Sequence, residues 1–231
     1  MPPSTATLFA VLCLAQAARS FQPAPVPRAR RSSTAAFSTP NADAAAAAAS
    51  VNKAAGATSE PQLRIGHGYD IHRLEAGAAP LVVGGVTIPF ELGVVAHSDG
   101  DVIYHSICDA IFGALGLPDI GQFFPDNDPR WKGATSDVFM AEAHRQMDLR
   151  GYKLGNVDVT LIAQKPRMMP HKPAMKENIV ALLQSTPDRV NVKARTHEGV
   201  DAVGEVRAIE CHVCLLMEKA PDPEKKMTIG F

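Results

Sequence analysis

The sequence predicts an α/β protein of the two-layer α+β kind, in which helices pack on one mixed β-sheet. Two observations lead to this prediction. Apolar runs of strand length alternate with segments of helical periodicity between residues 63 and 219. Glycine and proline separate these segments, as they do between the elements of a packed domain. Roughly 155 to 160 residues are available, which is close to the commonest size of a single domain.

The first half of this domain begins with a predicted strand over residues 63–71. A hairpin follows over residues 81–88, with Gly84 and Gly85 at its turn. Ser98 or Asp99 can cap a helix that runs from about residue 101 to residue 115 and stops near Gly116. Residues 121–133 read as a loop, because they combine glycine, proline and aspartate.

The second half continues the alternation of helices and strands. An amphipathic helix is expected over residues 135–150, where Gly151 provides the stop signal. The remaining predicted elements are a strand over 156–164, a helix over 170–184, and strands over 189–195 and 207–218. We expect residues 220–231 to be a C-terminal tail.

Residues 1–62 differ in composition and are predicted to be a targeting leader with a disordered linker. A short apolar run over residues 7–15 gives a signal-like segment of about residues 1–20. A transit-like segment of about 21–62 follows, rich in Arg, Ser and Ala, in which Asp43 is the first acidic residue of the chain. This order resembles the bipartite leaders of proteins bound for plastids and predicts the chloroplast stroma. Ordinary secretion before a disordered linker is the alternative.

Charge and cysteine content exclude several functions. A net charge of −1 argues against a general nucleic-acid or membrane-surface binder. Cys13 lies in the leader, which leaves Cys108, Cys211 and Cys214 with no disulfide framework. Strand alternation places Cys211 and Cys214 on opposite faces, so we interpret the cysteines as core residues rather than metal ligands.

Asp70 and His72 are candidate metal ligands, because side chains two apart on a strand point to the same side. The helix that begins near Asp101 offers His105 as a third ligand, and Asp101, His105 and Asp109 form one stripe on it. A carboxylate beside a ligand histidine can fix its tautomer. Three nitrogen and oxygen ligands leave zinc an open position for substrate. A lone Asp-x-His pair more often consists of solvated surface side chains than of metal ligands, and a histidine within a helix is usually structural.

Several motifs in order resemble those of one enzyme family. They are residues 64–72, residues 97–101 with His105 and Asp109, residues 119–121 and 124–126, and residues 156–160, 163–168 and 191–194. Together they resemble the 2-C-methyl-D-erythritol 2,4-cyclodiphosphate synthase family, in its plastid-type branch. The resemblance covers residues 63–219.

The resemblance implies a homotrimeric phosphorus–oxygen lyase of the non-mevalonate (MEP) pathway of isoprenoid and terpenoid biosynthesis. Such an enzyme converts 4-diphosphocytidyl-2-C-methyl-D-erythritol 2-phosphate to the 2,4-cyclodiphosphate and CMP, in active sites between subunits. Asp70, His72 and His105 would bind zinc, and Glu198 a magnesium or manganese ion. Asp109 would support His105, and His97 and Ser98 would lie on a mobile segment that covers the substrate. Thr196 would meet the diphosphate together with Glu198. The implied substrate contacts are Asp119, Ile120, Gly121, Phe124 and Asp126 for methylerythritol, and Ala163, Pro166, Arg167, Met168, Met169, Ala194 and Arg195 for cytidine.

The sequence departs from bacterial members after Ala194. Ala202 and Glu205 stand where those members carry an aromatic residue and an arginine that face the trimer's central channel. We therefore expect no isoprenoid diphosphate to bind there. A zinc-dependent phosphate hydrolase and an inactive nucleotide-binding module are the alternative functions. Neither nucleic acid nor, for the mature form, a membrane is expected as a partner.

Overall fold

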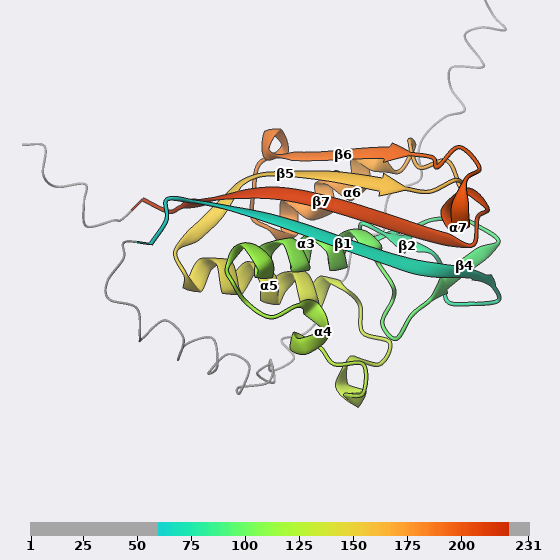
Figure 1. Ribbon diagram of the computed structural model, residues 1–231, viewed down its shortest axis with the longest axis horizontal. Helices are drawn as coiled ribbons and strands as arrows, with labels where there is room; N and C mark the ends of the chain where they lie inside the picture. Colours follow the sequence, from blue (N-terminus) through green and yellow to red (C-terminus); the bar gives the residue numbers. More distant parts are fainter. Residues whose placement is uncertain (1–59, 222–231) are drawn as a thin grey trace, which may run out of the picture. The chain divides into compact units, whose positions relative to one another are not determined.

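The computed structural model describes residues 60–221 and contains the predicted mixed sheet (Figure 1). Its strand order is β4-β1-β7-β5-β6, and β5 and β6 are the one parallel pair. The sheet strands are β1 (Leu63–Ala76), β4 (Leu92–Val95), β5 (Tyr152–Ile162), β6 (Val190–Arg195) and β7 (Ala208–Lys219). Nearly all of the predicted leader and of the predicted tail lies outside the described residues.

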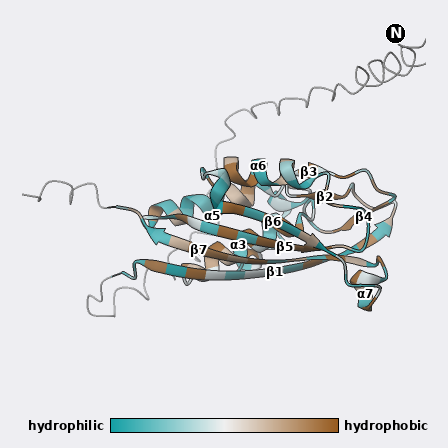
Figure 2. Ribbon diagram, turned by 90° about the horizontal axis from the view of Figure 1, so that it is seen from above, coloured by the Kyte–Doolittle hydropathy of each residue, from teal (hydrophilic) through white to brown (hydrophobic). Residues whose placement is uncertain are grey.

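Helices cover one face of this sheet (Figure 2). The longer helices are α3 (Val102–Ala114), α5 (Asp137–Leu149) and α6 (Lys172–Leu182). Short turns of helix are α4 (Ile120–Phe123), α7 (Asp201–Gly204), and the 3-10 segments η1 (Pro129–Trp131) and η2 (Pro187–Arg189). Strands β2 (Val82–Val83) and β3 (Val86–Thr87) form the predicted hairpin. No helix within residues 60–221 is long and apolar enough to cross a bilayer.

Burial alternates along the strands because only one face of the sheet is covered. In β7 the odd-numbered residues 209 to 217 point toward the helices and are buried. In β1 the odd-numbered residues, including Ile65 and Tyr69, point the other way and are exposed on the uncovered face. The alternation is the pattern expected of an antiparallel sheet with one open face.

Two glycines of β1 bring helix α3 unusually close to the sheet. A Cβ atom at Gly66 would lie 1.9 Å from the carbonyl oxygen of Ala110, and one at Gly68 would lie 1.9 Å from that of Ser106. The Ser106 hydroxyl also donates a 3.1 Å hydrogen bond to the Cys211 carbonyl of β7. Because Gly66 and Gly68 have no side chains, β1 and α3 can lie this close together.

Several local predictions were wrong. Asp101, rather than Ser98 or Asp99, caps α3, because its carboxylate accepts the backbone N–H groups of Ile103 and Tyr104. The segment predicted as a loop over 121–133 contains η1 and most of α4. Strand β4, which pairs with an extended β1, was not predicted. Cys211 and Cys214 do lie on opposite faces, but Cys214 is exposed and is therefore not a core residue.

Candidate metal centre and adjoining cavities

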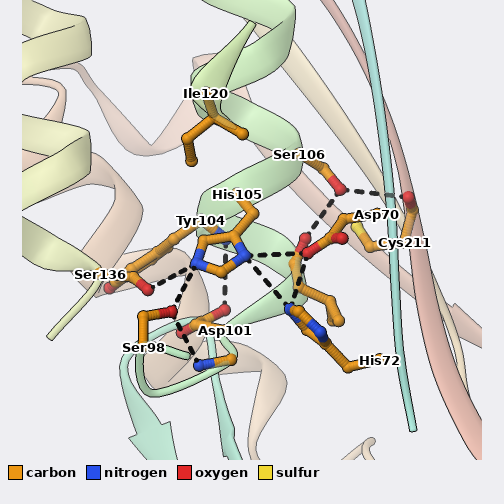
Figure 3. A network of polar contacts seen from close by, with 12 residues as sticks. Asp70, His72, Ser98, Asp101, Tyr104, His105, Ser106, Ile120, Ser136 and Cys211 are labelled. Carbon is orange, nitrogen blue, oxygen red and sulfur yellow. Dashed lines mark hydrogen bonds and ion pairs between the residues drawn. The ribbon is translucent and has the colours of Figure 1, made fainter. Parts of the chain in front are cut away.

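Asp70, His72 and His105 converge on one point, as the sequence predicts (Figure 3). Asp70 Oδ2 lies 3.0 Å from His72 Nε2 and 3.0 Å from His105 Nδ1. The two histidine nitrogens are 3.2 Å apart. Asp70 and His72 share the inner side of β1, and α3 places His105 above them. The three ligand atoms thus form a nearly equilateral triangle.

This triangle fits a tetrahedral metal ion. Zinc bonds of about 2.0–2.1 Å at tetrahedral angles separate neighbouring ligand atoms by roughly 3.3 Å. The observed separations of 3.0 to 3.2 Å are close to that value. One carboxylate oxygen and two imidazole nitrogens are also a donor set that suits a divalent transition metal. The geometry leaves a fourth direction open toward a cavity.

His105 is oriented through its second ring nitrogen by a serine. Ser136 Oγ lies 2.9 Å from His105 Nε2, and Ser98 Oγ lies 3.3 Å from the same atom. Ser136 in turn donates its hydroxyl and its backbone N–H to the carboxylate of Asp99. Acceptance of the Nε2 proton by Ser136 leaves Nδ1 unprotonated and free for a metal ion. Asp99 and Ser136 were not among the predicted site residues.

Asp109, which the resemblance implied as a support of His105, makes its hydrogen bond to the start of α4 instead. Its Oδ1 atom accepts the backbone N–H of Ile120 at 2.7 Å. The hydrogen bonds of the His105 ring within residues 60–221 go elsewhere, to Asp70, His72, Ser98 and Ser136. Asp109 thus acts on His105 by charge alone and anchors the start of α4.

The electrostatics of the metal-free cluster favour charged groups. Burial favours the protonated carboxyl of Asp70, but hydrogen bonds from His105 and His72 outweigh it and hold the pKa of Asp70 well below its usual range. Burial likewise favours the neutral His105 ring, yet the hydrogen bond and charge of Asp70 raise the pKa of His105 above 6.5. The cluster therefore has a net affinity for positive charge, which a proton or a metal ion can supply.

Asp101 holds the hairpin against the start of α3. Its fully buried carboxylate accepts the backbone N–H groups of Gly84 at 2.9 Å and Gly85 at 2.6 Å, besides those of the helix. Burial raises the pKa of Asp101 to about 6, in opposition to these donors, which favour the ionised form. Asp101 is thus a structural residue that fixes the helix turn bearing His105.

A cavity of about 300 Å³ opens beside the ligand triangle. Several of the predicted residues line it together with His72 and His105, namely His97, Ser98, Ile120, Gly121, Phe124 and Asp126. Asp119 does not line this cavity, because its carboxylate caps α4 by accepting the backbone N–H of Gln122. The cavity is large enough for a small polyol phosphate.

A second cavity of about 490 Å³ lies at the ends of β5 and β6. Its lining contains the whole set predicted for cytidine, which is Ala163, Pro166, Arg167, Met168, Met169, Ala194 and Arg195, and also Thr196. The Thr196 hydroxyl donates to the Glu198 carboxylate, which is exposed on the following turn. Among residues 60–221, none lines both cavities.

Fold and site together define an α/β protein with a triad of side chains suited to a divalent metal ion and a second, larger cavity. The YgbB family model matches residues 63–218, and the chain belongs to this family. A curated chloroplastic 2-C-methyl-D-erythritol 2,4-cyclodiphosphate synthase from Arabidopsis thaliana is 52% identical over 185 residues, covering 78% of this chain and 80% of the relative. The synthase of Geobacter sulfurreducens is 52% identical over 157 residues, 68% of this chain and 99% of the relative.

Solved structures agree with this assignment. A Plasmodium falciparum IspF in a CDP complex superposes with a TM-score of 0.63 at 39% identity and covers 71% of this chain and 100% of its own. The mixed sheet with packed helices predicted from the sequence is therefore the fold of this family.

Proposed function

We propose that the chain is a cyclodiphosphate synthase of the MEP pathway. It converts 4-diphosphocytidyl-2-C-methyl-D-erythritol 2-phosphate to 2-C-methyl-D-erythritol 2,4-cyclodiphosphate and CMP. The observation that carries this proposal is the ligand triangle of Asp70, His72 and His105 within a chain that matches the synthase family over its whole domain. Two relatives that carry the name of this synthase are each 52% identical to the chain, and they support the substrate assignment.

The proposed reaction is an intramolecular displacement at phosphorus. An oxygen of the substrate's 2-phosphate attacks the β-phosphorus, a new P–O bond closes the ring, and the P–O bond to CMP breaks. The leaving group of this displacement is CMP, which departs through an oxygen of its phosphate. Such a reaction makes the enzyme a phosphorus–oxygen lyase. The substrate carries its own nucleophile, so the chain needs to position and neutralise phosphates rather than attack them.

Each part of the site has a proposed role in this displacement. Asp70, His72 and His105 would hold zinc, which neutralises and polarises a bound phosphate. Ser136 and Asp99 would fix the His105 ring, while His97 and Ser98, which line the cavity, would cover the bound substrate. Ile120, Gly121, Phe124 and Asp126 would contact the methylerythritol part, and Asp119 and Asp109 would position α4 beside it.

The second cavity is the proposed site for the CDP part. Arg167 and Arg195 line it and can neutralise phosphate, and Arg167 can do so through its planar fork. Met168, Met169, Pro166, Ala163 and Ala194 supply apolar surface for a base. Thr196 and Glu198 follow at the end of β6, where Glu198 would bind magnesium or manganese together with diphosphate oxygens.

We infer a homotrimer from the uncovered sheet face. Leu63, Ile65, Tyr69 and Ile71 of β1 lie on it, and Ile65 is 78% exposed. Such an apolar strip is typical of a surface buried between subunits. Sites between subunits would bring the metal cavity of one chain to the cytidine cavity of the next. Ile65→Glu should dissociate the trimer and abolish turnover, while Leu149→Glu, at a 65% exposed position on α5, should do neither. Sedimentation velocity measures this, and a trimeric Ile65→Glu protein contradicts it.

We propose that residues 1–62 target the synthase domain of residues 63–219 to the plastid stroma, with 220–231 as a tail. The chloroplastic names of the plant relatives support this localisation. A fluorescent protein fused to residues 1–62 should reach the stroma, and its secretion would favour the alternative.

Exposed Glu205, paired with Arg207 at 2.6 Å, should exclude isoprenoid diphosphates from the trimer channel. A crystal of the trimer with farnesyl diphosphate bound there would contradict this.

Product analysis tests the activity itself. Wild-type protein should release CMP together with the cyclic diphosphate in equal amounts. A linear phosphate product would instead identify a hydrolase, and no turnover would identify an inactive nucleotide-binding module. His105→Ala should abolish turnover. His144→Ala is the control, because it also replaces a histidine but one outside the ligand triangle, and it should leave turnover unchanged.

A further inference from the structure

The chain contacts the folded domain before strand β1 begins. The carbonyl oxygen of Gln62 accepts a 2.8 Å hydrogen bond from the backbone N–H of Lys219, the last residue of β7. This bond extends the antiparallel pairing of β1 and β7 beyond Leu63 (Figure 1). Residues 60–62, which the sequence assigned to the leader, therefore need to be considered together with the domain.

Tyr152, the first residue of β5, binds the two residues that precede Gln62. The tyrosine is buried, and its hydroxyl lies 2.6 Å from the Pro61 carbonyl oxygen and 3.0 Å from Glu60 Oε2. Both of these atoms are hydrogen-bond acceptors, and the hydroxyl is the donor. A buried hydroxyl that loses its acceptors destabilises the folded state. Removal of residues 60 and 61 would take both acceptors away from Tyr152.

Two cations lie against the Tyr152 ring, and Glu60 supplies a carboxylate that balances their charge. The guanidinium carbon of Arg64 is 5.1 Å from the ring centroid, and Lys219 Nζ is 4.5 Å from it. Arg64 Nη2 also donates a 3.0 Å hydrogen bond to Glu60 Oε2. The hydrogen bonds from Arg64 and Tyr152 hold the pKa of the Glu60 carboxyl below its ordinary value. Glu60 is therefore ionised at neutral pH and attracts both cations.

Arg64 connects these contacts to helix α3. Its Nη1 atom donates a 3.1 Å hydrogen bond to the carbonyl oxygen of Ala114, the last residue of α3. A cation at the C-terminal end of a helix is favoured by the helix dipole. Glu60 thus holds the side chain that caps the helix bearing His105. We call Glu60 and Pro61, with their partners Arg64 and Tyr152, the N-terminal latch.

We propose that the peptidase which removes the leader cleaves before Glu60, so that the mature enzyme keeps its N-terminal latch. This proposal rests on the proposed targeting role of the leader. Hydrolysis of one peptide bond upstream of Glu60 consumes one water molecule and leaves every contact of the latch in place. Hydrolysis after Pro61 would remove both acceptors of Tyr152. A segment whose backbone is hydrogen-bonded to the domain is also a poor site for proteolysis.

Import of the full chain into isolated chloroplasts locates the cleavage. The imported protein is purified from the stroma, and its intact mass is measured by mass spectrometry. We expect a mass that includes Glu60 and Pro61 and lacks an upstream part of the leader. A stromal protein that begins at Pro61 or later, or one that keeps the whole leader, would overturn the proposal.

Urea unfolding of the full chain tests the latch itself, whether or not the chain is imported. Tyr152→Phe and Glu60→Lys should each raise the equilibrium constant for unfolding by roughly two- to tenfold, because one removes the hydroxyl and the other reverses the balancing charge. Glu177→Lys, at an exposed position of α6, is the matched control and should unfold as wild type does. Failure of import would refute the targeting role alone. Wild-type stability of both Tyr152→Phe and Glu60→Lys would overturn the latch.

Discussion

Replacement of Gly68 by alanine would separate the two elements that carry the metal ligands. The new Cβ would stand 1.9 Å from the Ser106 carbonyl oxygen, whereas an ordinary contact needs at least 3.4 Å. Backbone occupies that space, so α3 must retreat from β1 by about 1.5 Å to relieve the overlap. His105 would move with α3, while Asp70 and His72 would stay on β1.

The size of the effect follows from this displacement. Overpacking of a well-packed core reduces the free energy of unfolding by about 1–3 kcal/mol, and the overlap at Gly68 favours the upper end. A misplacement of about 1 Å at a reacting centre lowers activity by roughly 100-fold. We therefore expect Gly68→Ala to be destabilised by about 3 kcal/mol and to lose both zinc affinity and CMP release.

Urea unfolding, zinc content and CMP release together measure these changes. Gly113→Ala is the matched control, because Gly113 lies on the exposed side of α3 and a Cβ there meets nothing within 4 Å. Helix propensity predicts a gain of about 0.5–1 kcal/mol for this control. Wild-type stability and full zinc occupancy in Gly68→Ala would refute the idea that close approach of α3 builds the metal site.

Three further outcomes are expected. Ser136→Ala should lower zinc affinity by roughly 10–100-fold, because the His105 ring loses its orienting partner. Ser185→Ala should not, since it removes a buried hydroxyl that has no hydrogen-bond partner within residues 60–221. Equal zinc affinities of these two variants by calorimetry would exclude the orienting role. In the metal-free protein Asp70 raises the pKa of His105 above 6.5, so the ring is mostly protonated at pH 6.5 and below. Zinc binding should therefore release a proton at pH 6.5, and progressively less of one as the pH rises through that pKa. Calorimetry in buffers of different ionisation enthalpy counts the released protons, and zero release at pH 6.5 would contradict the shift. Glu198→Gln should raise the magnesium concentration needed for half-maximal turnover and leave zinc content unchanged; an unaltered magnesium dependence would remove Glu198 from the metal site.

The convergence of Asp70, His72 and His105 was predictable because strand and helix periodicities are simple. Residues two apart on a strand share a side, which fixed Asp70 with His72, and a helix following a capping residue supplied His105. The residues expected at the cytidine came from family resemblance, and the structure shows that their side chains line one cavity; their contact with cytidine stays a prediction. The mixed sheet followed from the alternation of strand and helix patterns.

The side chains and the strand that hold these three residues in place were not predictable from the sequence. Ser136 reaches His105 only because α5 folds back beside α3, and no local pattern in the sequence marks that contact. Asp101 looked like part of a ligand stripe, yet four backbone N–H groups surround its buried carboxylate. Strand β4 was missed because Leu92–Val95 is a short segment, and its strand character arises from pairing with β1.

Reconstitution of metal-free protein with zinc tests the central claim most directly. Three side chains from β1 and α3 are proposed to hold one ion that takes part in CMP release. Metal-free protein should release no CMP, and activity should return in proportion to added Zn²⁺ and reach its limit at one equivalent per chain in the magnesium-containing assay. Full CMP release by metal-free protein, or by Asp70→Asn without bound zinc, would contradict the claim.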